Sequence, residues 1–142
     1  VLKQAREMGL NVPVVGGDGM GSPKLAQIAG KKNATNVYYT THFSTKSKEP
    51  EVVKFLKAYK AKYGEEPATF SSLAYDSVYM IVDAAKNEGE VSSSAIQKGL
   101  ANLKNFKGVT GNITMDSKHN PQKSVVVEQM TDGKVSKAYT VK

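Results

Sequence analysis

One acidic residue lies inside a run of glycines near the start of the chain. Asp18 stands in the segment Val14-Val15-Gly16-Gly17-Asp18-Gly19-Met20-Gly21-Ser22-Pro23. A short apolar run that ends in glycines is typical of a buried parallel strand followed by a loop at its carboxyl end. Ligands of open α/β sheets bind at that end. Asp18 is therefore a fixed negative charge near a predicted crevice, and it suits an ammonium group better than a phosphate.

Two other interpretations of this loop compete with an ammonium site. A phosphate-binding loop is disfavoured, because the segment lacks the Lys-Ser/Thr ending of nucleoside-triphosphate loops and departs from the dinucleotide fingerprint. A carboxylate in its middle would also repel phosphate. In the other interpretation Asp18 is a turn residue that bonds its own backbone. The residues alone favour ligand contact and this turn role about equally.

The remaining polar residues predict no enzyme, no cofactor and no metal site. The chain has no cysteine, which excludes a thiol catalyst, and its only histidines are His42 and His119. The sequence identifies no carboxylate or nucleophile that could partner His42. Asp116, His119 and Asn120 match no calcium motif, and their surroundings predict a β-turn.

Composition further limits the function classes. The chain of 142 residues carries a net charge of +7, and Arg6 is its only arginine. Reading of nucleic-acid bases favours arginine, so scattered lysines indicate a solvated surface and no nucleic-acid partner is expected. No apolar run approaches the length needed to span a membrane. The chain starts without methionine inside a predicted helix, and we expect it to be a piece of a longer protein.

The elements that would position Asp18 alternate between helix and strand. A helix is expected to end at Gly9, and a second begins with the cap Ser22-Pro23 and ends at Gly30. Between and after them, Val14-Val15 and Asn36–Thr41 are predicted strands. This order indicates a parallel sheet in an α/β fold.

The second half of the chain changes from helices to strands. After a polar linker, three helices are predicted, and the second should be the buried one because its apolar residues lie on most faces. An Asp-Gly pair between the last two strands predicts a β-hairpin. The helices are expected over 50–63, 70–85 and 92–103, and the strands over 109–115, 124–130 and 135–141.

The start of the second of these helices is another candidate site. Phe70, Ser71 and Ser72 combine an aromatic ring with small hydroxyl residues, which can line a pocket. The same residues can simply pack a helix N-terminus, and for Phe70 alone packing is favoured. Tyr75 and Asp76 are adjacent on this helix and point apart, which argues against an acid–base pair.

Six segments, taken in order, resemble a known family. They are Gln4–Gly9, Pro13–Gly19, Ala58–Gly64 with Pro67, Ala74–Val78, Phe106–Gly111 and Asp132–Val135. Together they resemble the C-terminal part of the branched-chain amino-acid (Leu/Ile/Val) substrate-binding proteins of ABC transporters, which have the type I periplasmic-binding-protein fold. The resemblance covers nearly the whole chain.

The resemblance implies an α/β fold with parallel strands, flanking helices, a C-terminal β-hairpin and portions of two lobes. Residues 1–142 would be a C-terminal fragment of a two-lobe ligand-binding domain. Residues 1–41 and 110–142 would supply second-lobe elements, and residues 50–103 would supply first-lobe helices. The crossovers would lie near 42–49 and 104–111. In this family a ligand binds between the lobes, and hinge closure traps it.

The resemblance also assigns roles to the candidate residues. Asp18, flanked by Gly17 and Gly19, would pair with the α-ammonium of an amino acid. Phe70, Ser71 and Ser72 would form the wall that touches the aliphatic side chain. The groups that hold the ligand carboxylate would lie outside this chain.

The function implied by the resemblance is that of a solute-binding component of an ABC importer for a branched-chain or other aliphatic amino acid. Its partners would be leucine, isoleucine or valine and a membrane permease. The location would be extracytoplasmic, either periplasmic or as a cell-surface lipoprotein whose anchor is not in this chain. A ligand-sensing domain of a receptor or regulator is the alternative. Incomplete half-lobes also predict self-association of the fragment.

Overall fold

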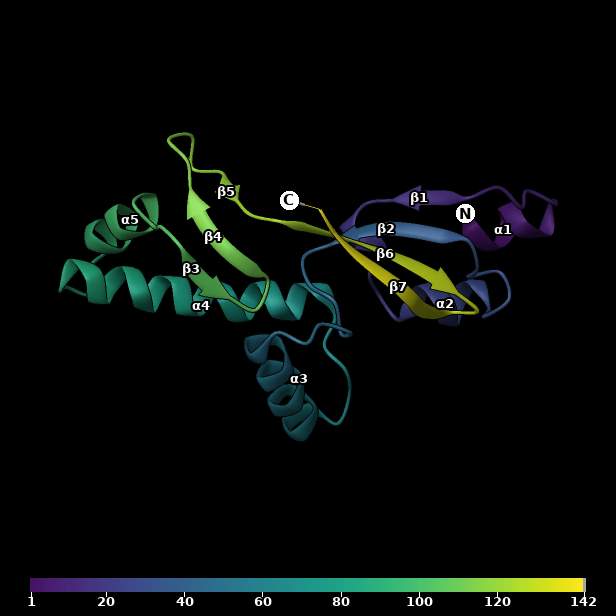
Figure 1. Ribbon diagram of the computed structural model, residues 1–142, viewed down its shortest axis with the longest axis horizontal. Helices are drawn as coiled ribbons and strands as arrows, with labels where there is room; N and C mark the ends of the chain where they lie inside the picture. The colour runs from purple at the N-terminus through teal and green to yellow at the C-terminus, as the bar shows by residue number, and fades with distance from the viewer. Residues whose placement is uncertain (142) are drawn as a thin grey trace. The chain divides into compact units, whose positions relative to one another are not determined.

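The computed structural model describes residues 1–141, which divide into two units. The first unit contains residues 1–47 and the chain from residue 125 onward, and the second contains residues 48–124. Each unit has its own β-structure, four strands in the first and three in the second (Figure 1).

The sheet of the first unit is mixed and has the order β1-β2-β6-β7. β1 and β2 are parallel, as predicted, and the other neighbours are antiparallel. The predicted hairpin joins β6 and β7 through Asp132 and Gly133, whose φ angles of 49° and 73° are the positive values that such turns need. The strands are β1 (Val14–Gly16), β2 (Val37–Thr41), β6 (Val125–Thr131) and β7 (Lys134–Val141).

Two short helices, α1 (Leu2–Glu7) and α2 (Lys24–Ala29), complete the first unit. Its core contains Leu2, Ala29, Ala34, Val37, Tyr39 and Met130. Helix α2 begins just after the predicted cap, and the Ser22 hydroxyl accepts a hydrogen bond from the Lys24 N–H at 3.3 Å. This side chain therefore stabilises the helix start as predicted, although Pro23 occupies the cap position itself.

Strand β1 corrects the prediction of a fully buried strand. Val14 is partly buried against the core, but 77% of the Val15 surface is exposed. β1 lies at the edge of the sheet, and successive side chains of a strand point to opposite faces. Only the face that carries Val14 is covered within this unit.

The second unit consists of three helices and three short strands. Pro50 in the first turn and Gly64 after the last residue, with φ of 74°, bound α3 as predicted. The Ser92 hydroxyl accepts from the Ala95 N–H and caps α5. The elements are α3 (Pro50–Tyr63), α4 (Thr69–Glu88), α5 (Ser93–Ala101), β3 (Phe106–Gly108), β4 (Gly111–Met115) and β5 (Pro121–Gln122).

Helix α4 is not the buried element that its composition predicts. Its buried residues are Thr69, Ser72, Asp76 and Ala84, whereas several large apolar side chains are exposed. Within the second unit, α5 and the hairpin of β3 and β4 lie along one side of α4 (Figure 1). α3 contacts α4 near its start, where the Tyr59 hydroxyl lies 3.2 Å from that of Ser71 and the Phe55 ring lies 4.9 Å from that of Tyr75. α4 carries apolar residues on most of its faces, and these contacts leave several of them exposed. The exposed set is Phe70, Tyr75, Val78, Tyr79, Ile81 and Val82.

Residues 110–124 lie in the same unit as the three helices α3, α4 and α5. The reason is strand pairing, since β4 pairs with β3 and β5 pairs with β4. The chain passes between units at 47/48 and 124/125. How these units correspond to the two lobes of the related fold stays a prediction.

Candidate functional site

The Asp18 loop directly follows β1. Asp18 opens the short 3₁₀ helix η1 (Asp18–Met20), after Gly16 and Gly17. A Cβ at Gly16 would overlap the Met20 sulfur, so a larger residue there would force the Met20 side chain to move from its place against the core. At Gly17 and Gly19, apart from each glycine and its two chain neighbours, no atom of the described residues lies within 4 Å of the place a Cβ would take. The loop therefore has open space beside both glycines.

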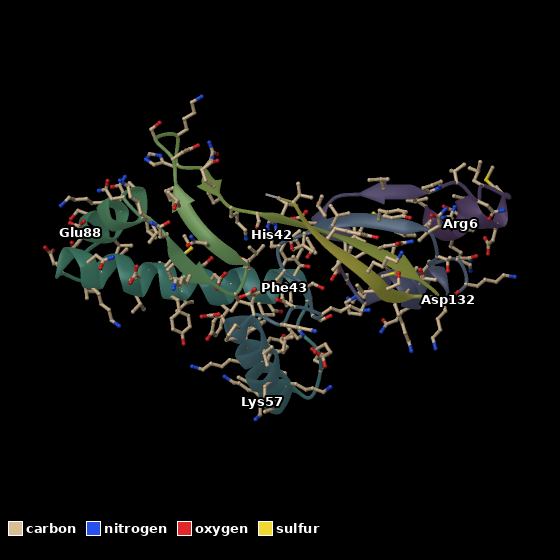
Figure 2. The ribbon with its side chains drawn as sticks, viewed as in Figure 1. Arg6, His42, Phe43, Lys57, Glu88 and Asp132 are labelled. Carbon is tan, nitrogen blue, oxygen red and sulfur yellow. The ribbon has the colours of Figure 1, made fainter. Side chains whose placement is uncertain are left out.

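The structure supplies a partner for Asp18 that the sequence did not identify. His42 is the first residue after β2 (Figure 2), and its Nε2 lies 3.2 Å from the Asp18 Oδ2. The two residues meet because β1 and β2 are parallel neighbours, whose carboxyl ends lie at the same edge of the sheet. No local pattern could have shown this contact, which depends on the strand pairing.

The Asp18–His42 pair is only partly covered. The Asp18 side chain is 45% exposed and the His42 side chain 30% exposed. Within the described residues the Asp18 carboxylate has no other hydrogen-bond partner, and the buried His42 Nδ1 has none. Among residues 1–141, no group orients Nδ1 and no nucleophile bonds to Nε2, so the hydrogen bonds of a catalytic triad are not seen around His42 in this part of the chain.

The predicted wall residues lie in the second unit, at the start of α4. The Phe70 side chain is 62% exposed, and the Ser71 hydroxyl lies 3.2 Å from the Tyr59 hydroxyl. Ser72 is fully buried, and its hydroxyl donates to the Thr69 carbonyl at 2.6 Å. Asp18, Gly17 and Gly19 belong to the first unit, so each set is positioned by a different sheet and helix framework.

Glu128 is a buried carboxylate that the sequence analysis missed. It lies opposite Tyr39 in the pairing of β2 with β6. Its Oε2 accepts from the Tyr39 hydroxyl at 2.8 Å, and its Oε1 accepts from the Ser44 hydroxyl at 2.6 Å. Burial of the ring, with a contribution from the Glu128 charge, raises the pKa of Tyr39 above its ordinary value. The sequence signal for its burial was its place two residues before Met130 on the same predicted strand, because alternate residues of a strand lie on the same face.

Asp76 is the corresponding carboxylate of the second unit. Only 3% exposed, it accepts the Val109 N–H on Oδ1 and the Thr110 N–H on Oδ2, both at 2.8 Å. A Cβ at Gly108 would come within 2.5 Å of Oδ2, so this approach requires glycine. As predicted, the neighbouring Tyr75 faces elsewhere, with its ring 4.9 Å from that of Phe55.

Lys123 also lies in the second unit, and its buried Nζ has no hydrogen-bond partner among the described residues. Burial lowers the pKa of Lys123 to about 8, and the attraction of Asp76 opposes this shift without cancelling it. The ammonium form of this side chain is therefore disfavoured in the folded unit.

The loop at Asp116 is the turn that the sequence predicted. Its Oδ1 accepts the N–H groups of Lys118 and Asn120 at 2.8 and 2.9 Å. The backbone N–H of Asn120 is the main cause that holds the pKa of Asp116 below its ordinary value. Among residues 1–141, no group of three His, Asp or Glu side chains could hold a metal ion. No helix in this part of the chain is long and apolar enough to cross a membrane.

Comparison with known proteins identifies the class. The periplasmic binding protein family matches residues 1–134, and the chain belongs to that family. The α/β fold predicted from the resemblance is thereby confirmed, together with the similarity to branched-chain amino-acid binding proteins.

Individual relatives make the similarity specific. The branched-chain amino-acid transporter substrate-binding protein LivJ from Streptococcus pneumoniae, solved in complex with isoleucine, is 43% identical and superposes with a TM-score of 0.91 over 99% of this chain and 40% of its own. The leucine-binding protein LivK from Thermotoga maritima is 33% identical, with a TM-score of 0.89 over 99% of this chain and 40% of its own.

Relatives found by sequence belong to the same group of binding proteins as these solved structures. The Leu/Ile/Val-binding protein homolog 1 from Brucella abortus is 28% identical over 122 residues, which are 86% of this chain and 32% of that protein. The chain thus spans about a third of this relative and two-fifths of the two solved structures.

Proposed function

We propose that this chain works as part of the solute-binding component of an ABC importer, and that Asp18 pairs with the α-ammonium of a branched-chain or other aliphatic amino acid. The role is binding and not catalysis. The observation that carries the proposal is the half-exposed Asp18 carboxylate, paired with His42 through one oxygen, at the carboxyl ends of two parallel strands. LivJ was solved in complex with isoleucine and LivK is a leucine-binding protein, which supports an aliphatic amino acid as the ligand class.

Three features of the loop support ammonium binding. A carboxylate with one partner retains lone pairs for an incoming N–H donor. Open space beside Gly17 and Gly19 lets a ligand approach the backbone closely. Partial exposure of Asp18 means that its charge is not already desolvated, and a ligand that covers it would form a charge-assisted hydrogen bond.

The aliphatic part of the ligand would contact residues at the start of α4. Phe70 presents an exposed ring, and Ser71 adjoins it with a hydroxyl that bonds Tyr59. The burial of Ser72 gives it a packing role beneath these two residues. Groups for the ligand carboxylate would come from the part of the relatives that this chain does not match.

The same proposal sets the partners and location. A membrane permease would receive the amino acid, and the protein would act outside the cytoplasm, in the periplasm or as an anchored surface lipoprotein. The exposed apolar side chains of β1 and α4 support association of the chain with a copy of itself. Sedimentation of the 142-residue chain at micromolar concentration would show dimers or larger species, whereas a stable monomer would contradict that part.

The test of the function is a calorimetric titration of the complete binding protein that carries this sequence. Leucine, isoleucine and valine are compared with the α-hydroxy analogue of leucine, which keeps the carboxylate and the aliphatic chain but lacks the ammonium. We expect binding of the amino acids, and at least about tenfold weaker binding of the analogue, since loss of one partner leaves the Asp18 charge uncompensated. Equal affinity for both would contradict an ammonium site.

A further inference from the structure

We propose that His42 is a positioning residue for the ammonium site: its imidazole holds one oxygen of the Asp18 carboxylate and leaves the other for the ligand. This inference rests on the proposed function. Its observation is the contact of 3.2 Å between His42 Nε2 and Asp18 Oδ2, with no partner recorded for Oδ1 within the described residues.

The need for a positioning residue follows from the loop. Hydrogen bonds of η1 hold the backbone at Asp18, where the Met20 N–H donates to the Gly17 carbonyl, but the half-exposed Asp18 side chain can still rotate. Its carboxylate would otherwise sample several orientations, and ordering it during binding would lower the affinity. A fixed donor removes that entropic cost before the ligand arrives.

His42 is anchored well enough to supply this donor. It follows β2 directly, and β2 is paired on both sides, with β1 and with β6. Thr41, the last residue of β2, lies opposite Val126 in this register. The imidazole is thus attached to an inner strand of the sheet, whereas Asp18 is attached to a loop beyond the edge strand.

Proton positions define what the imidazole does. An ionised carboxylate only accepts hydrogen bonds, so Nε2 carries the proton that it donates to Asp18. Nδ1 is buried and unpaired, and a proton there would be a buried donor without an acceptor. Of the two neutral tautomers, the geometry therefore favours the one with the proton on Nε2. A neutral imidazole orients the carboxylate without cancelling its charge, which a lysine at this place would do.

Two substitutions separate this role from simple packing. In His42→Asn the amide nitrogen falls near the place of Nδ1 and cannot reach Asp18, whereas in His42→Gln it reaches the place of Nε2. We expect His42→Asn to weaken leucine binding by the complete protein about five- to tenfold. The His42→Gln variant should bind leucine at least about threefold more tightly than the His42→Asn variant. The matched control is His119→Asn, which removes the other imidazole from an exposed turn and should change the affinity less than about twofold.

A double-mutant cycle shows whether His42 acts through Asp18. In the Asp18→Asn background, His42→Asn should change leucine affinity less than about twofold, because the carboxylate that it orients is gone. Additive losses would overturn the inference, and so would equal effects of the Asn and Gln variants. If Asp18→Asn alone left leucine binding intact, the proposed function itself would fail instead.

A measurement without ligand completes the test. Nitrogen-15 chemical shifts of the His42 ring in the 142-residue chain distinguish the two neutral tautomers. The inference predicts that Nε2 carries the proton, with His119→Asn used to assign the two histidine signals. A predominantly Nδ1–H ring would overturn it.

Discussion

Two carboxylates of the first unit occupy opposite environments. Glu128 is 6% exposed, and hydroxyls from Tyr39 and Ser44 engage both of its oxygens. Asp18 is 45% exposed at its side chain and has one partner, His42. Each contact of Glu128 joins β6 to β2 or to the segment that follows it, whereas Asp18 contributes little to the core. A carboxylate whose hydrogen bonds are complete holds the fold, and one with spare capacity remains free to bind.

Asp76 extends the comparison to the second unit. It resembles Glu128 in its burial, and its two oxygens bond the backbone N–H groups of Val109 and Thr110. Glu128 and Asp76 are thus buried carboxylates whose two oxygens are both hydrogen-bonded and which hold the framework of their units. Substitutions can measure this difference. Those at Glu128 and Asp76 should lower the stability of the fold, whereas those at Asp18 should weaken ligand binding.

The largest effect on stability is expected from Asp76→Asn. The amide keeps one acceptor but turns an N–H₂ group toward a backbone N–H donor, so a buried hydrogen bond to a charged group is lost. We expect the free energy of unfolding to fall by about 2–4 kcal/mol, measured by urea denaturation of the 142-residue chain. Asp83→Asn, on the same helix with Asn87 as its partner, is the control and should change it by less than about 0.5 kcal/mol. Equal losses would contradict the role of Asp76.

Tyr39→Phe tests the Glu128 cluster with a smaller expected effect. The substitution removes one hydroxyl donor and leaves the rest of the ring in place, so Oε2 of the buried Glu128 loses its partner. The free energy of unfolding should fall by about 1–3 kcal/mol. An unchanged midpoint in urea would show that this hydrogen bond does not stabilise the fold.

The same substitution has a pH signature. Burial and the nearby Glu128 raise the pKa of Tyr39 above its ordinary value of 10.0 in the folded state, so above pH 10 the unfolded chain loses the tyrosine proton first. The folded state then binds more protons, and stability that is present below pH 10 is lost as pH rises. Tyr39→Phe should weaken this loss in alkaline urea titrations.

Lys123→Met should have the smallest effect, and in the opposite direction. Burial lowers the pKa of this amine from 10.5 to about 8, so between these values the unfolded chain binds more protons and wild-type stability rises with pH. Below pH 8 the amine is charged in both states, and the buried charge lowers the stability. The Met variant should be more stable there, by about 1 kcal/mol or less, and should lose the rise between pH 8 and 10.5. A less stable variant at pH 7 would contradict this account.

Local chemistry explains what the sequence could predict. Asp132-Gly133 fixes a hairpin by its own backbone preference, and Pro50 and Gly64 bound a helix in the same way. The position of Asp18 after a strand that ends in glycines was also readable, because an apolar run and two glycines are local features.

Long-range pairing explains what the sequence could not predict. The contact of His42 with Asp18 and that of Glu128 with Tyr39 both depend on which strands are neighbours and in which register. The exposure of α4 has a related cause, since the pattern of Val78 and Ile81 shows an apolar helix but not which of its sides the rest of the unit covers. That residues 110–124 belong to the second unit likewise depends on the pairing of β4 with β3.

The most direct test of the central claim is Asp18→Asn in the complete binding protein, with leucine affinity and the free energy of unfolding measured on the same sample. Glu128→Gln is the comparison variant. We expect Asp18→Asn to weaken leucine binding at least about tenfold, since it removes the charge opposite the ammonium. Its unfolding free energy should stay within about 0.5 kcal/mol of wild type, because an exposed pair contributes little. Undiminished leucine binding by Asp18→Asn would contradict the assignment of Asp18 as the residue that binds the ammonium. So would a weaker binding that comes with a fall in the free energy of unfolding like that of Glu128→Gln.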